Sequence, residues 1–150
     1  MIESIHKGYT VHIKQLEQLL QTYDFIDFAL LFGSYANGTQ KALSDIDIGI
    51  YTNRSIDLLE QGYLISTLEE KSEKTLDLVI LNNLYKNNAK LAFNIVDNHK
   101  IILCDNTEAY THFKTYTYKY YFDQKPMYEM FDNALLERIE SGTYGKAQAS

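Results

Sequence analysis

The chain has 150 residues, and 45% of them are hydrophobic, which is enough for a single core and little more. Its formal net charge of −6 argues against a protein that binds nucleic acid through clustered lysine and arginine, and its single cysteine, Cys104, excludes an intrachain disulfide and a cysteine-rich zinc site. We therefore expect one domain over residues 1–140, followed by a flexible polar tail at residues 141–150.

The N-terminal region predicts a helix. Apolar residues recur at helical spacing from Ile2 to Thr22, which is typical of an amphipathic scaffold helix. His6 and His12 lie on it, but a spacing of six residues does not place them on one face, so we expect surface or capping histidines rather than metal ligands. Because Glu3 is acidic and no long apolar run follows, we expect no signal peptide and no membrane span, and a cytoplasmic protein.

A near-continuous apolar run from Phe25 to Phe32 predicts a central β-strand that is buried on both faces. Gly33 and Ser34 follow it directly, and we expect them to open a short helix, where free backbone N–H groups and the helix dipole favour phosphate. The glycine permits close approach of the backbone to a triphosphate, and the serine hydroxyl can donate to a phosphate oxygen. The alternative for Ser34 is a simple helix N-cap, a role that is compatible with a phosphate contact.

The second predicted strand, Asp45 to Tyr51, begins with two carboxylates. Because successive side chains of a strand point to opposite faces, Asp45 and Asp47 share one face and the alternating isoleucines fill the other. Two unpaired carboxylates repel each other and are costly to desolvate, and a divalent cation with oxygen ligands is the usual resolution. The alternative is a tight turn with a solvated acidic strand end.

The pattern G-S-x-A-x-G-x5-S-D-x-D is met at all seven fixed positions, by Gly33, Ser34, Ala36, Gly38, Ser44, Asp45 and Asp47. This pattern resembles the signature of the nucleotidyltransferase superfamily and, in its longer form, of the minimal nucleotidyltransferase (MNT) family. The resemblance implies a fold of the α/β (α+β) class, with a small mixed sheet flanked by helices and with C-terminal helices. It also implies that Gly33, Ser34 and Ser44 bind the nucleotide.

A third strand is predicted at Thr75 to Leu81, after a helix that Ser55 could cap and that reaches about Lys71 with its leucines covering one sheet face. Asp77 is the single charge in this strand, and a buried charge there demands a partner. In the resembled family a third carboxylate comes from such a strand and completes the metal site, and Asp77 occupies that position. The alternative is an edge-strand carboxylate that faces water.

The rest of the chain predicts packing elements. Leu84 to Asp97 is typical of a helix and Ile101 to Leu103 of a short strand. Aromatic residues then recur near helical spacing from Thr107 to Tyr121, Pro126 breaks the pattern, and Met127 to Ile139 resumes it. This aromatic stripe is either core or, because it exceeds what one small sheet can cover, a protein–protein interface, and both interpretations stay open.

The predicted chemistry is nucleotidyl transfer from ATP at a site with two Mg²⁺ ions, which neutralise phosphate charge and align the attacking hydroxyl. We expect Asp45 and Asp47 to bind both ions, and Asp77 to bind one on the acceptor side and to help take the proton. Many members of the resembled family are antitoxins that transfer AMP from ATP to a tyrosine of a HEPN ribonuclease toxin. The resemblance therefore implies an Mg-dependent protein adenylyltransferase in a hetero-oligomer with a separate toxin, because this chain lacks the R-x4-6-H motif of HEPN proteins.

Two other functions stay open. An antitoxin could neutralise its partner by contact alone, although the presence of all three motif carboxylates counts against a vestigial site. A transferase for a small molecule such as an aminoglycoside would need an added substrate-binding domain that this length barely allows. Stable binding to nucleic acid is not expected, given the charge and the lack of a groove-binding element.

Overall fold

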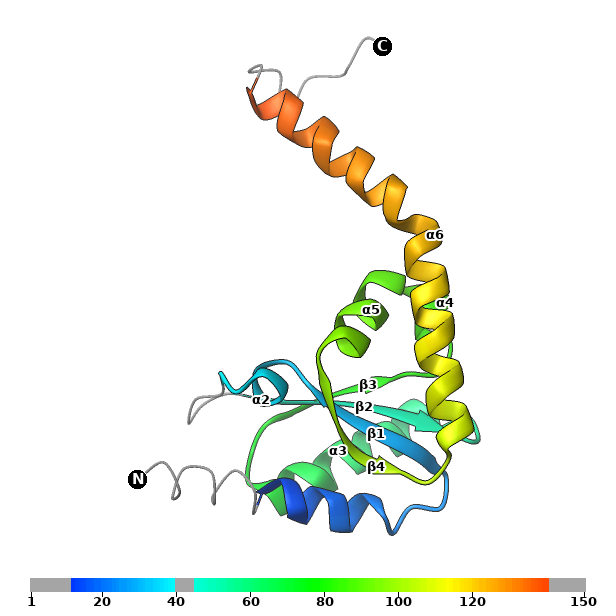
Figure 1. The fold of residues 1–150 in the computed structure, drawn as a ribbon. Coiled ribbons are helices and arrows are strands. Elements are labelled where there is room, and N and C mark those ends of the chain that lie inside the picture. Colours follow the sequence, from blue (N-terminus) through cyan, green and yellow to red (C-terminus); the bar gives the residue numbers. More distant parts are fainter. Residues whose placement is uncertain (1–11, 40–44, 141–150) are drawn as a thin grey trace.

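The computed structural model describes residues 12–39 and 45–140, with only the backbone for residue 125 and residues 127–140. At its centre lies a four-stranded sheet in the order β3-β2-β1-β4 (Figure 1). The strands are β1 (Ile26–Phe32), β2 (Ile46–Thr52), β3 (Leu76–Ile80) and β4 (His99–Cys104). β1 is antiparallel to β2 and β4, whereas β2 and β3 are parallel. The mixed sheet predicted from the sequence is confirmed, and so is each of its strands.

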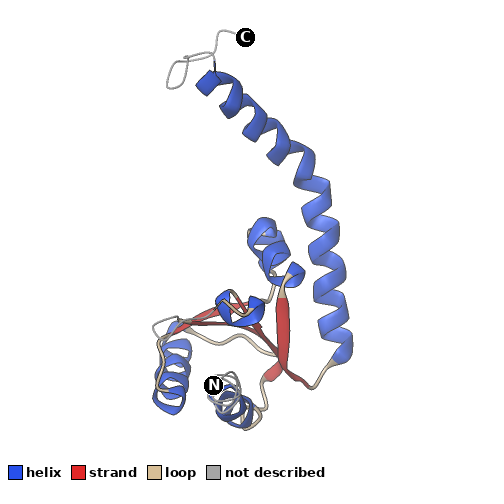
Figure 2. Ribbon diagram, turned by 60° about the vertical axis from the view of Figure 1, so that its left-hand side comes forward, coloured by secondary structure: helices blue, strands red, loops and turns tan. Residues whose placement is uncertain are grey.

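Helices cover both faces of this sheet, which Figure 2 shows between two groups of helices. Residues 12–20 are helical. They are followed along the chain by α2 (Ser34–Asn37), α3 (Leu58–Ser72), α4 (Leu84–Asn87), α5 (Ala89–Asp97) and α6 (Thr107–Glu140). His12 is half-buried. His6 and the tail at residues 141–150 lie outside the described residues.

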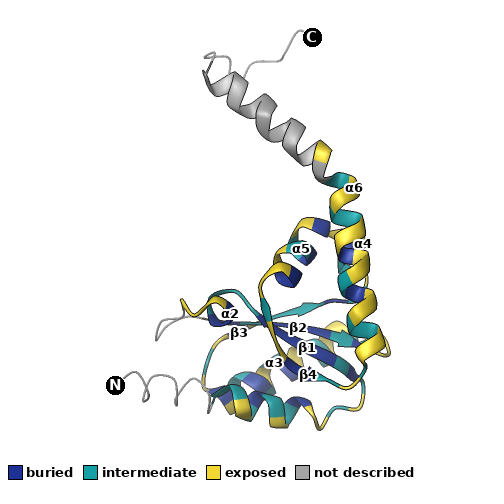
Figure 3. Ribbon diagram, in the orientation of Figure 1, coloured by how far each residue is buried: buried dark blue, intermediate teal, exposed yellow. Residues whose placement is uncertain are grey.

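The sheet has one apolar core on each face. Ile46, Ile48 and Ile50 are fully buried and pack with leucines of the N-terminal helix and α3. Phe28 and Leu30 pack instead with residues of α4, α5 and α6. Figure 3 shows burial concentrated on the strands and on the helix sides that meet them. Because Asp47 alternates with the buried isoleucines, its side chain lies on the face that α5 and α6 cover.

Two helix boundaries differ from the sequence-based expectation because nearby side chains supply better caps. α3 begins at Leu58 rather than near Ser55, since the Asp57 carboxylate accepts a hydrogen bond from the Glu60 N–H at 2.8 Å. The segment from Leu84 to Asp97 is two helices rather than one. Asn88 separates them, and its side chain caps α5 by accepting from the Leu91 N–H at 3.1 Å.

The last helix, α6, runs as a single element through Pro126, where the sequence pattern predicts a break. Figure 1 shows α6 changing direction along its length and then extending past the sheet with no other labelled element beside it. Proline removes one backbone N–H and crowds the preceding turn, so it bends a helix that continues on both sides. None of the helices within residues 12–39 and 45–140 combines the length and the apolar character needed to cross a membrane.

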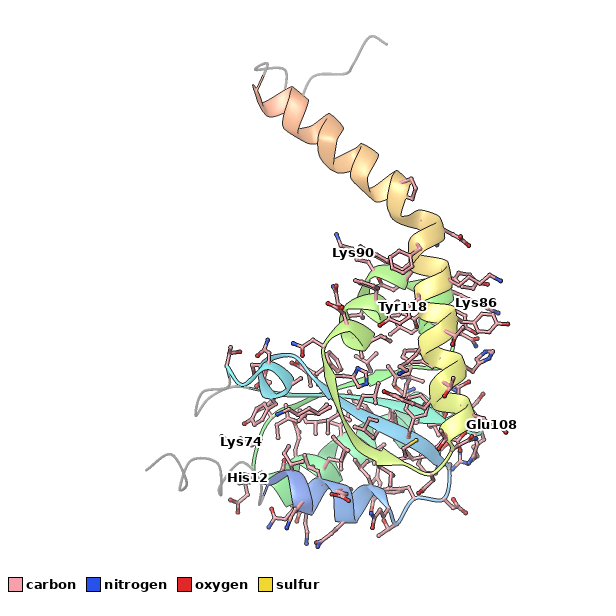
Figure 4. All side chains as sticks on the ribbon, in the orientation of Figure 1. His12, Lys74, Lys86, Lys90, Glu108 and Tyr118 are labelled. Carbon is pink, nitrogen blue, oxygen red and sulfur yellow. The ribbon has the colours of Figure 1, made fainter. Side chains whose placement is uncertain are left out.

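The aromatic stripe of α6 divides between core and surface. Phe113 is fully buried, whereas Tyr116, Tyr118 and Phe122 are 36%, 38% and 52% exposed. Tyr118, labelled in Figure 4, lies on the stretch of α6 beside α5, where Phe93 meets its ring edge-on at 5.9 Å. The core interpretation therefore holds for one side of the helix, and the interface interpretation stays a prediction for the other.

Candidate functional site

The turn from β1 into α2 requires glycine at position 33. Gly33 has φ of 70°, a left-handed value that other residues rarely adopt, and it is the N-cap of α2. A Cβ built on it would collide with the carboxylate of Asp47. Gly38 ends the helix, also with a left-handed φ, of 77°. The short helix is confirmed, but the N-cap role considered for Ser34 is wrong, because Ser34 is the first residue inside α2 and is half-buried.

Strand register places a row of four side chains across this end of the sheet. Asp47 pairs with Asp77 in the parallel ladder and with Phe32 in the antiparallel one, and Phe32 in turn pairs with His99. Directly opposed residues of neighbouring strands point to the same face, so the four side chains line one side of the sheet. The row lies where β1 delivers its chain to α2, and it brings two of the three predicted carboxylates together.

Asp77 is exposed, so the expectation of a buried charge in the third strand is wrong. The reason is topological, because β3 is an edge strand. The alternative of a carboxylate facing water is correct in that respect. Asp77 nevertheless lies opposite Asp47, so one side of its carboxylate faces another negative group.

Electrostatics at the row are unfavourable without a counter-charge. The pKa of Asp47 is raised, first by its partial burial and then by the negative charge of Asp77, a side-chain hydrogen bond with Asp77 and the charge of Asp45. Each of these effects disfavours the ionised form. The fold thus holds two carboxylates close together at a cost that a bound cation would relieve.

The other predicted ligands are less closely placed. Asp45 is exposed immediately before β2, and its charge is the weakest of the causes that raise the pKa of Asp47. Ser44 lies outside the described residues. Within residues 12–39 and 45–140, no three His, Cys, Asp or Glu side chains are gathered closely enough to form a ready-made metal-binding group. The three-carboxylate site for two ions stays a prediction.

His99 closes the row at its far side, and no motif or spacing in the sequence singles it out. Its Nδ1 lies 2.9 Å from the carbonyl oxygen of Val96 and 3.1 Å from that of Ile95, so Nδ1 carries the hydrogen and donates to the end of α5. Nε2 then accepts from the hydroxyl of Tyr110 at 2.8 Å. Both ring nitrogens have partners, which fixes the orientation of the ring and joins β4, α5 and α6 beside the row.

The donor set fits a hard divalent cation such as Mg²⁺. Carboxylate oxygens are its preferred protein ligands, and Asp47 and Asp77 present them from adjacent strands. Beside them the β1–α2 turn brings the Gly33 backbone against the Asp47 carboxylate, and the Gly33 carbonyl accepts from the N–H groups of Ala36 and Asn37. Carboxylates next to such a turn are the combination that binding of a metal-bound phosphate requires.

Comparison with known sequences agrees with this geometry. The family model described as "Polymerase beta, Nucleotidyltransferase" matches residues 14–108, which include all four strands and the turn at Gly33. The chain belongs to this nucleotidyltransferase family. No curated protein matches the sequence significantly.

Solved structures with the same fold come from toxin–antitoxin systems. A chain of a crystal structure of a toxin–antitoxin with AMP-PNP is 24% identical, with a TM-score of 0.70, over 81% of this chain and 97% of that one. A structure of a tri-AMPylated Shewanella oneidensis HEPN toxin in complex with MNT antitoxin gives 20% identity and a TM-score of 0.66, over 84% and 98% of the two chains. The toxin–antitoxin MntA-HepT gives 20% and 0.65, over 83% and 97%. At these identities the likeness establishes the fold.

Proposed function

We propose that this protein is an antitoxin that transfers AMP from ATP to a tyrosine hydroxyl of a separate HEPN-type toxin and thereby neutralises it. The observation that carries the proposal is the pair of opposed carboxylates, Asp47 and Asp77, beside the Gly33 turn. Similar structures support the choice of substrate and partner, since one contains AMP-PNP and another an AMPylated HEPN toxin with an MNT antitoxin. We expect the antitoxin and its toxin to act in the cytoplasm.

The residues of the motif have two roles in this proposal, which are binding of the nucleotide and binding of the metal ions. The backbone at Gly33 and the Ser34 hydroxyl bind phosphate oxygens at the start of α2, and Ser44 contributes to nucleotide binding through the same motif. Asp45 and Asp47 would hold two Mg²⁺ ions with Asp77. When bound, these ions would neutralise the charge of the triphosphate and activate the acceptor hydroxyl.

Asp77 is placed to serve the acceptor. Its position on the edge strand leaves it exposed, so a tyrosine on the surface of another protein can reach it. Asp77 accepts the proton of the tyrosine hydroxyl as the tyrosine oxygen forms a bond to the α-phosphorus of ATP. The bond between that phosphorus and pyrophosphate breaks, and pyrophosphate leaves with the electron pair. An acceptor on a protein surface suits this open edge, which supports the choice of a protein substrate.

Intact-mass spectrometry of a co-expressed HEPN-type partner tests the proposal. The purified pair is incubated with ATP and Mg²⁺, and the Asp45→Asn/Asp47→Asn double variant serves as the control. We expect the partner to gain whole AMP units with the wild type and none with the variant, which still folds because both changes relieve repulsion.

Three outcomes would overturn the proposal. If the partner forms a stable complex but gains no AMP, neutralisation by contact alone would replace it. If a small molecule such as an aminoglycoside gains AMP and the partner does not, the protein would be a small-molecule transferase. If the double variant transfers AMP as well as the wild type, the assignment of the carboxylates is wrong.

A further inference from the structure

The N-terminal half of α3 carries an exposed apolar surface. Leu58, Leu59 and Tyr63, which we name the α3 patch, are 84%, 83% and 73% exposed, more than any other large hydrophobic residue that the structure describes. The sequence pattern predicts that the leucines of this helix cover the sheet. Leu64 and Leu68 do so, but the two leucines of the patch do not. Grouped apolar exposure of this extent is typical of a surface that binds another molecule.

A preformed groove lies beside the α3 patch. It has a volume of about 390 Å³ and is lined by Tyr23, Phe25, Leu59, Glu60, Tyr63 and Leu64. The rings of Tyr23 and Phe25 contact each other at 5.4 Å, and the Arg54 guanidinium lies 4.6 Å above the Phe25 ring. Arg54 is itself fixed by two hydrogen bonds to Glu60, at 2.9 and 3.3 Å. The side of the groove formed by Tyr23, Phe25 and Glu60 is therefore held by contacts within the protein.

The rim of the groove is negatively charged. The pKa of Arg54 is raised, first by its hydrogen bond with Glu60 and also by the charges of Glu60, Asp24 and Asp57, so all three carboxylates lie near this one guanidinium. Three carboxylates and one guanidinium leave the rim with a net negative charge. A second copy of this chain would bring an identical acidic rim and be repelled, whereas apolar side chains flanked by lysine or arginine would match both the groove and the rim.

The α3 patch is remote from the proposed catalytic end, which is the end of the sheet that holds Gly33 and Asp47. α3 starts after β2 has ended at Thr52, whereas Asp47 lies near the beginning of that strand, roughly 17 Å from Thr52 at the rise of an extended strand. The two also lie on opposite faces of the sheet, because α3 packs against the isoleucines of β2. Occupation of the groove leaves the carboxylates accessible.

We infer that the α3 patch and its groove form a docking surface for a basic, apolar segment of the protein that receives the nucleotidyl group. The inference rests on the proposed function for the identity of that partner. Docking at this surface holds the partner while its tyrosine enters and leaves the catalytic end. The surface therefore contributes to affinity and not to the chemical step.

Kinetics and binding of two variants test this inference. Leu59→Ser/Tyr63→Ser replaces two of the three side chains of the α3 patch, and Ile101→Ser, which removes an exposed apolar side chain from β4, is the control. We expect the first variant to weaken affinity for the HEPN-type partner and to raise KM for it roughly tenfold or more, with kcat unchanged. The control should leave both constants near the wild-type values. All three positions are exposed, so unchanged thermal unfolding checks the fold of each variant.

Other outcomes would overturn the docking surface. Equal affinity of the wild type and the patch variant would do so, and so would equal losses in both variants. Affinity that does not fall with added salt would contradict the basic segment. A dimer of the isolated chain in sedimentation, lost in the patch variant, would assign the groove to a second copy. Because affinity is measured without ATP, a partner that binds but gains no AMP refutes the proposed function and leaves this test intact.

Discussion

The two ends of the sheet differ in how their polar side chains are paired. At the end opposite Gly33, the polar side chains have hydrogen-bond partners. The Asn82 side chain accepts from the N–H of Thr52 at 2.9 Å and donates to its carbonyl at 2.8 Å, although Thr52 is only 4% exposed. Asn53 and Asn106 each donate to a different carboxylate oxygen of Asp27, at 3.3 Å. Donors meet acceptors there, as buried and half-buried polar groups require.

The catalytic end does the opposite. Asp47 faces Asp77, so two carboxyl groups are opposed, and the pKa of Asp47 is raised by burial and by that neighbour. Beside it, Gly33 has a positive φ that other residues rarely adopt, and its lack of a Cβ leaves room for the Asp47 carboxylate. Local rules are kept where the sheet only needs to be stable and broken where a ligand would complete the arrangement. This contrast supports the proposed site at the Gly33 end of the sheet.

The largest effect is expected from filling the space beside Asp47. Gly33→Ala places a Cβ where the carboxylate now lies and forces a left-handed φ on alanine. We expect AMP transfer to fall about 100-fold or more, because small displacements of catalytic groups cost that much. Steady-state transfer to the partner measures it.

Gly38→Ala is the matched control for this change. Its φ is equally left-handed, but a Cβ there meets nothing within 4 Å. It should cost about 1–2 kcal/mol of stability and leave turnover of the folded enzyme intact. Equal loss of transfer in both variants would attribute the effect to backbone strain instead of the Asp47 carboxylate.

A substitution at the end of the sheet opposite Gly33 should change the stability of the protein and not its catalytic rate. Asn82→Ala leaves the buried N–H and carbonyl of Thr52 without their partners, so we expect a loss of about 1–3 kcal/mol in the free energy of unfolding. Urea unfolding measures this loss, and kcat per folded molecule should not change. Asn94→Ala, at an exposed position of α5, is the control and should unfold like the wild type. A drop in kcat for Asn82→Ala would contradict the separation of the two ends.

Asp47→Asn, in the presence of EDTA, is expected to raise the free energy of unfolding slightly, whereas Asn82→Ala lowers it. The folded-state pKa of Asp47 lies above its unfolded value, so the folded state binds more protons and this group's contribution to stability falls as pH rises through the folded pKa. Removing the charge should stabilise the protein at neutral pH by less than about 1 kcal/mol, since solvent screens this half-buried group.

The pH dependence provides the check on that prediction. In thermal melts with EDTA, the wild type should gain stability relative to Asp47→Asn as pH is lowered from 7 toward the usual range of a carboxyl group. A variant that is less stable than the wild type at neutral pH would show that Asp47 has a favourable partner at the catalytic end.

Much of this site follows from short-range pattern. Alternation of side chains along β2 is a local property, and the sequence predicts it correctly. The short helix after Gly33 is also predicted, but the contact with the Asp47 carboxylate that requires glycine there depends on the pairing of β1 with β2. The exposure of Asp77 is not local, because a strand becomes an edge only when the whole sheet order is known. His99 joins the row only through its register with Phe32, which no spacing in the chain encodes.

The errors in the helices have a similar origin. Periodicity groups Leu58 and Leu59 with the core leucines of α3, but the start of the helix lies past the end of β2, where no sheet surface remains to cover them. Pro126 predicts a break because it removes a hydrogen bond, and a helix continues through it as a bend. Such outcomes depend on what lies nearby in space and not on the residues themselves.

Calorimetric titration of Mg²⁺ into the protein, with AMP-PNP present, asks whether the opposed carboxylates form a cation site that is completed with nucleotide. The wild type and Gly38→Ala are predicted to bind Mg²⁺ together with the nucleotide, and Asp47→Asn/Asp77→Asn is predicted to lose roughly tenfold or more in affinity for the ion. Equal Mg²⁺ binding by the double variant would contradict this cation site, because other ligands would then hold the ion.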